Sequence, residues 1–167
     1  IGAYISDSYA WDEIAYLSPY YLQVASAGND GDNNANTDPI ATGFDKLVGN
    51  KVAKNNLVVA NAQDVSTNSD GTISGSININ SSSSQGPTDD FRIKPDITGN
   101  GTGLTSTNST SNTSTTVMTG TSMSSPNVAG SLILLQQHHN NLYGSFMRSA
   151  TLKGLACHTA DDGGDIG

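Results

Sequence analysis

Cysteine, positive charge and long apolar runs are all scarce in this chain of 167 residues. Cys157 is its only cysteine, which excludes an intrachain disulfide and a thiolate-rich zinc site. No apolar run reaches the roughly 18 residues that a membrane-spanning helix needs. Charged residues make up 13% of the chain, and most of its polarity comes from Ser, Thr, Asn and Gly. This composition predicts one loop-rich domain with much of its backbone in turns.

Positive charge is limited to 7 Lys and Arg residues against 15 Asp and Glu, a net charge of −8. Nucleic acids and anionic lipid surfaces are bound by clusters of Lys and Arg, so we expect neither as a partner. A polar, acidic surface is typical of a soluble protein and is compatible with secretion. The opening "IGAYISDSYAWDEI" has no Met, basic segment or leader-like apolar core, so we expect no signal peptide in these residues. With the abrupt ending "HTADDGGDIG", this indicates a piece of a longer protein.

Alternating strands and helices predict an α/β fold with a mostly parallel sheet. We expect a short helix over residues 11–17 and buried strands over residues 20–29 and 56–63. Asp70-Gly71, between two extended stretches, predicts a hairpin. The low-complexity run "STNSTSNTSTT" predicts an exposed, mobile loop. Two helices are expected near the end of the chain, over residues 122–139 and 145–158.

The first of these two helices carries apolar side chains on nearly every side, which predicts a central, buried helix. The side chains are those of Met123, Val128, Ala129, Leu132, Ile133, Leu134 and Leu135. Pro126 is expected in its first turn, where a missing N–H costs little. Ser122 then lies at the helix N-terminus, where unpaired N–H groups and the positive end of the dipole converge. Two interpretations fit this position: an N-cap residue, or a nucleophile whose oxyanion is stabilised there.

The residues around Ser122 favour the nucleophile. "GTSMSSPNVAG" closely resembles the nucleophile motif of subtilisin-like serine proteases, the subtilases. "VASAGNDG" resembles the segment that carries their oxyanion-hole asparagine, here Asn29, which precedes Ser122 by 93 residues. "SSSSQGPTDDFRIKPDITGNG" resembles the stretch between them, although the family usually has Ala-Pro-Gly after "KPDI". The resemblance implies a three-layer subtilisin-like α/β fold, with residues 1–167 forming the C-terminal part of a secreted endopeptidase's catalytic domain.

The resemblance also implies roles in hydrolysing a polypeptide substrate. Ser122 would attack the scissile carbonyl, its backbone N–H and the Asn29 amide would hold the oxyanion, and Thr121 would help to shape that hole. We therefore expect the Asn29 amide and the Ser122 hydroxyl on one surface, within about 10 Å of each other. The alternative for Asn29 is an ordinary turn residue. Three small residues would form one wall of the substrate cleft: Ser26, Ala27 and Gly28.

A serine nucleophile needs a base, and the subtilase motifs for it are missing from this sequence. The family places Asp first, His second and Ser last. Its Asp-Thr/Ser-Gly and His-Gly-Thr motifs do not occur before Asn29, since Asp7-Ser8 is followed by Tyr9. We therefore expect that Asp and His precede this chain in the parent protein, and that the chain alone is inactive.

All three histidines follow Ser122. His138 lies 16 residues along the predicted helix, about 24 Å away, and His139 is further, whereas a base must come within about 3 Å. His158 would return to Ser122 only if the second helix runs back antiparallel, with Asp161 or Asp162 beside it.

No cofactor or metal site is expected. Asp30, Asp32 and Asn34 alternate like the start of a calcium loop, but positions 35 and 41 hold Ala where that loop needs Gly and Glu. Subtilases often bind calcium, so calcium stays an alternative to a solvated turn.

Two other functions remain open. One is a non-catalytic, subtilase-like binding module. The other is a Ser/Thr/Asn-rich cell-surface or adhesion domain, which predicts no convergence of Asn29 and Ser122. A truncated sheet would also expose an edge that favours self-association.

Overall fold

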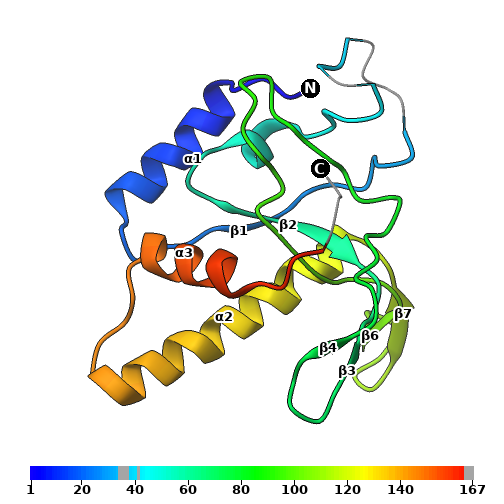
Figure 1. The fold of residues 1–167 in the computed structure, drawn as a ribbon, viewed down its shortest axis with the longest axis vertical. Helices are drawn as coiled ribbons and strands as arrows, with labels where there is room; N and C mark the ends of the chain where they lie inside the picture. The colour runs from blue at the N-terminus through cyan, green and yellow to red at the C-terminus, as the bar shows by residue number, and fades with distance from the viewer. Residues whose placement is uncertain (34–37, 41, 164–167) are drawn as a thin grey trace.

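The structure is a computed structural model that describes residues 1–33, 38–40 and 42–163. Helices and a parallel sheet make up its body, and two short hairpins follow strands of that sheet (Figure 1). The elements of the body are α1 (Ser6–Leu17), β1 (Val24–Ser26), the 3-10 helix η1 (Gly49–Val52), β2 (Leu57–Ala62), β5 (Ile97–Asn100), α2 (Thr121–Tyr143) and α3 (Ser149–Thr159). The hairpins are β3–β4 (Ser66–Thr67, Ile73–Ser74) and β6–β7 (Leu104–Thr107, Thr115–Met118).

The sheet has the order β1-β2-β5, and both pairings are parallel. All six residues of β2 are buried, because both faces of this central strand are covered. Leu57 and Val59 pack on one face against Val128 and Leu132 of α2, together with Met147 and Leu152. Val58 faces the opposite side and packs against Ala27, Leu47 and Val52. The chain is therefore a three-layer α/β protein with a parallel sheet and flanking helices, as predicted.

The sequence predicts the positions of the buried strands and helices more accurately than the residues at which they begin and end. The strand predicted over residues 56–63 is β2, and the hairpin at Asp70-Gly71 is β3–β4. The strand predicted over residues 20–29 is shorter, and α1 begins five residues earlier than expected. The run over residues 106–116 is exposed but is not all loop, because Ser106 pairs with Thr116 and Thr107 with Thr115. Thr residues favour strands, and the side chains of Asn108 and Ser114 hydrogen-bond within the turn.

One of the two interpretations of Ser122 and two expectations about α2 are wrong. Its N-cap residue is Gly120, so Ser122 is the second helical residue and not the cap. Pro126 is the sixth helical residue and lies beyond the first turn. The helix is not buried all round, since Leu132 is 6% exposed but Ile133 and Leu134 are 68% and 72% exposed. The face toward the sheet is covered, and no described segment covers the side on which Ile133 and Leu134 lie.

The described helices include none that is both long and apolar enough to cross a membrane.

Candidate active site

The N-terminus of α2 is fixed to the sheet near the ends of β2 and β5. The Ser124 hydroxyl is buried and lies 2.7 Å from the carbonyl oxygen of Ala60 and 2.8 Å from that of Gly99. The Gly120 N–H donates to the Gly101 carbonyl at 2.9 Å. These contacts place the first turn of the helix over the end of the sheet at which parallel strands commonly present functional groups.

Asn29 follows β1 and binds the residue directly before Ser122. Its Oδ1 accepts the Thr121 N–H at 2.9 Å and the Thr121 hydroxyl at 3.0 Å. The same hydroxyl accepts the Gly28 N–H at 3.1 Å. Two segments 92 residues apart in sequence are thereby joined at the helix N-terminus. The structure thus brings Asn29 to the start of the helix that carries Ser122.

Two N–H donors remain available beside Ser122. The Asn29 amide Nδ2 has no hydrogen-bond partner among the described residues, because the contacts to Thr121 use the other end of the amide. The Ser122 N–H lies in the first turn of the helix, where N–H groups have no intrahelical acceptor. The Ser122 side chain is exposed. Gly120 lets the amide approach, since a Cβ there would lie 3.3 Å from Asn29 Nδ2.

The three residues assigned to a substrate wall differ in their backbone contacts. Ala27 is fully buried and donates its N–H to the Val59 carbonyl at 2.9 Å. Gly28 uses both backbone groups, since its carbonyl accepts the Ser84 N–H at 2.9 Å. Ser26 is different, because alternate residues of a parallel strand bond to the same neighbour and Ala27 already bonds to β2. The Ser26 backbone therefore faces the other edge of β1, where the described residues form no strand.

No histidine in the described ranges hydrogen-bonds to Ser122. His139 lies near the other end of α2, where its Nδ1 is 2.8 Å from the Ser145 carbonyl. His158 is exposed in the last turn of α3. Its neighbour Cys157 contacts the Asp96 carbonyl, just before β5 begins, whereas the start of α2 is fixed near the end of that strand. The base that Ser122 would need is therefore not in place within the described part of the chain.

The calcium expectation falls partly outside the described residues, where Asn34, Ala35 and Ala41 lie. Asp32 accepts a hydrogen bond from the Ser81 hydroxyl at 3.1 Å, and the Asp30 N–H donates to Ser84. Across the described ranges, no three His, Cys, Asp or Glu side chains gather in a way that would hold a metal ion.

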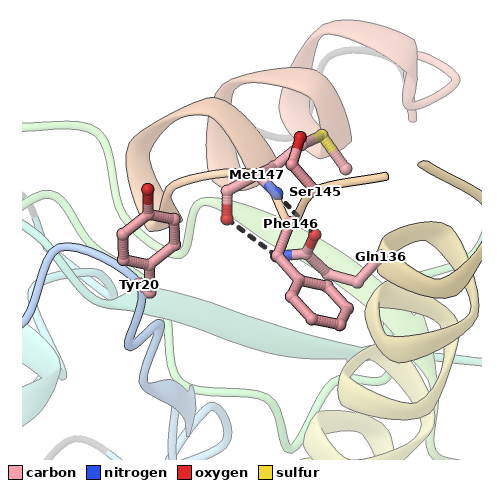
Figure 2. A pocket seen from close by; sticks show the side chains of 5 residues that line it. All are labelled: Tyr20, Gln136, Ser145, Phe146 and Met147. Atoms are coloured by element: carbon pink, nitrogen blue, oxygen red, sulfur yellow. Dashed lines mark hydrogen bonds between the residues drawn. The ribbon is translucent and has the colours of Figure 1, made fainter. Parts of the chain in front are cut away.

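A pocket of about 580 Å³ lies away from this site, beside the turn between α2 and α3. Figure 2 shows the Tyr20 and Phe146 rings at this pocket. It also shows the two hydrogen bonds between the Gln136 side chain and the Met147 backbone, each 2.9 Å long. These bonds close the turn, so we assign the pocket a structural origin.

Three residues near the site were not singled out from the sequence: Gly120, Ser124 and Lys51. Ser124 is buried because it contacts the carbonyl oxygens of Ala60 in β2 and Gly99 in β5. Lys51 lies in η1, and a Cβ on Gly28 would be 3.5 Å from its ammonium nitrogen. Contacts between residues that are far apart in the sequence produce no local sequence pattern from which they could be predicted.

The fold and the site together define a three-layer α/β protein. An exposed serine lies in the first turn of α2, the helix that packs one face against the sheet. The family model of the Subtilase family matches residues 5–167, and the chain belongs to that family of serine peptidases. A comparison with curated proteins finds no match.

Proposed function

We propose that this chain carries the nucleophile and the oxyanion hole of a subtilisin-like serine endopeptidase. The observation that supports this most strongly is the junction of Asn29 with Thr121, directly before Ser122. An adhesion domain would have no need for this junction. Ser122 attacks the carbonyl carbon of the scissile peptide bond, and the amine leaves when the tetrahedral intermediate collapses to an acyl-enzyme. Water then hydrolyses the acyl-enzyme and restores the Ser122 hydroxyl.

The oxyanion is held by the Asn29 amide and the Ser122 N–H. Donors fixed before the reaction stabilise developing charge without reorganising, and loss of one such donor typically lowers kcat by about 10²–10³-fold. Thr121 acts as a positioning residue, because it orients the Asn29 amide with two hydrogen bonds. No cofactor is needed for these steps, and a role for calcium stays outside the proposal.

The proton of Ser122 is removed by a histidine that another segment of the protein supplies. We propose that residues 1–167 form part of a catalytic domain, and that a preceding segment carries the Asp and His motifs. By itself this chain then does not hydrolyse peptides, since a serine hydroxyl without a base is a poor nucleophile. We further propose an extracellular location, in keeping with the acidic composition and with the family.

A non-catalytic binding module is the second candidate, and the lack of a base beside Ser122 in the described residues favours it. The two candidates differ in a proteolysis assay on casein. The 167-residue chain is compared with a longer chain in which a segment bearing both motifs precedes residue 1. We expect cleavage by the longer chain, abolished by Ser122→Ala and unchanged by Ser109→Ala, a control on the exposed hairpin. A longer, folded chain without activity would support the binding module.

A further inference from the structure

A lysine lies against the wall residue that precedes Asn29. The position that a Gly28 Cβ would occupy is 3.5 Å from Lys51 Nζ and 2.8 Å from the Ser84 hydroxyl. Gly28 also has a φ of +112°, a conformation that favours glycine. The absent side chain leaves the ammonium group next to the Gly28 backbone.

Lys51 is half-buried, and its ammonium group has no hydrogen-bond or ion-pair partner among the described residues. Other shielded lysines have one: Lys46 donates to the Gly31 carbonyl, and both Lys94 and Lys153 pair with Asp96. The Lys51 ammonium forms no ion pair or hydrogen bond with any residue in the described ranges, although the chain has 15 acidic residues against 7 basic ones. A shielded ammonium group normally donates to an acceptor, as the other three lysines do, so the missing acceptor here points to a ligand that supplies one.

The geometry points to Lys51 as a specificity-determining residue that selects Asp or Glu on the acyl side of the scissile bond. We propose that its ammonium group pairs with the side chain of the substrate residue whose carbonyl Ser122 attacks. This inference rests on the proposed function. A carbonyl held by Asn29 and Ser122 brings its own residue beside Gly28, because Gly28 directly precedes Asn29. Because Lys51 Nζ lies next to the Gly28 backbone, a carboxylate on that substrate residue reaches Lys51 and forms a charge-assisted hydrogen bond.

The net charge of −8 means that the binding of an acidic substrate side chain depends on the local positive charge of Lys51. An acidic peptide is repelled by the molecule as a whole, but salt screens such repulsion beyond about 8–10 Å. A contact with Lys51 is much shorter than that distance. The selection therefore depends on this one residue more than on the general surface charge.

The test uses the 167-residue chain and product-like peptides that end at the residue next to the cleaved bond. The acetylated peptides Ala-Ala-Pro-Glu and Ala-Ala-Pro-Gln, both with free C-termini, are titrated into 15N-labelled protein. Shifts of the Gly28, Asn29 and Ser122 amide signals report binding. We expect the Glu peptide to bind about five- to ten-fold more tightly than the Gln peptide. The C-terminal carboxylate is common to both peptides and cancels from the ratio.

Variants separate Lys51 from general charge. Lys51→Met keeps much of the aliphatic stem and should reduce the Glu/Gln ratio to less than about two-fold. Lys54→Met removes an exposed charge three residues away and should leave the ratio unchanged. A wild-type ratio near one, a ratio that survives Lys51→Met, or one lost equally in Lys54→Met would overturn the inference and leave the proposed function standing. If neither peptide shifts the signals of Gly28, Asn29 and Ser122, both the inference and the proposed site are overturned.

Discussion

Thr121 shows how single residues shape this site. It is fully buried, and its hydroxyl accepts the Gly28 N–H and donates to the side-chain oxygen Oδ1 of Asn29. The sequence motifs assign Thr121, Asn29 and Ser122 to one site, because they resemble the motifs of a known family. The hydrogen bonds that orient the amide, and the closeness of Lys51 to Gly28, depend on the exact approach of segments that are distant in sequence. No spacing rule predicts them.

Thr121→Val tests this hydroxyl, since valine keeps the shape but leaves the Gly28 N–H without an acceptor. We expect the free energy of unfolding to fall by about 1–3 kcal/mol. The amide signals of Gly28 and Asn29 should shift in the same variant. Thr113→Val, at an exposed position in the hairpin turn, is the control. Equal denaturant midpoints for both variants and the wild type would show that the Thr121 contacts contribute little.

At the scale of elements, a buried carboxylate helps to fix α1 to the rest of the fold. Asp12 accepts the backbone N–H groups of Lys54 at 3.0 Å and Asn55 at 2.7 Å, and the Tyr4 hydroxyl at 2.8 Å. Burial raises the pKa of Asp12, but these hydrogen bonds outweigh it and hold the pKa below its ordinary value of 3.8. The charged form therefore stabilises the fold above pH 4, and this contribution is lost as the pH falls through the lowered pKa.

Asp12→Asn should consequently reduce the free energy of unfolding by about 1–3 kcal/mol at pH 7. The difference from wild type should shrink as the pH falls below about 4, because protonation neutralises the wild-type carboxylate as well. Glu13→Gln on the exposed side of α1 should change little at either pH. Urea titrations at several pH values measure this, and a difference that stays constant from pH 7 to pH 2 would contradict the account.

The packing of α2 gives a second prediction at this scale. Leu132→Ala should cost about 2–5 kcal/mol, because this side chain packs between α2 and β2. Leu134→Ala should stay within about 0.5 kcal/mol, because Leu134 is 72% exposed. Denaturant midpoints compare the two variants directly. Similar losses for both would mean that the outer face of α2 is covered in solution.

This contrast also shows why the sequence predicts the position of α2 correctly but not the exposure of its side chains. Periodicity located α2, and the run "LVVANA" located β2, because both signals are local. Whether Ile133 and Leu134 are buried depends on which other segments pack against α2. The sequence of α2 alone does not identify those segments. Likewise, the composition of residues 106–116 predicts a mobile loop, yet pairing across the turn makes these residues part of the hairpin β6–β7.

At the scale of the whole molecule, the edge of β1 that no described strand pairs with, and the exposed apolar side chains, predict self-association. Unpaired strand edges offer N–H and carbonyl groups to other chains. Sedimentation velocity should show an average mass that rises with protein concentration. Ser26→Pro removes the N–H that faces the open edge and should lower this association, whereas Ser26→Ala should not. A monomer at all concentrations, or equal behaviour of the two variants, would contradict the prediction.

The central claim is that Ser122 is a nucleophile with its oxyanion hole in place and its base supplied by another segment. The rate at which a fluorophosphonate labels Ser122, followed by mass spectrometry, tests this most directly. In the 167-residue chain, Ser122 should be labelled no faster than the exposed Ser109. In the longer chain with both motifs, labelling should be on the order of 10²–10⁴-fold faster, the usual contribution of a positioned base. Fast labelling of Ser122 in the 167-residue chain, lost on His158→Ala, would contradict the account and make His158 the base.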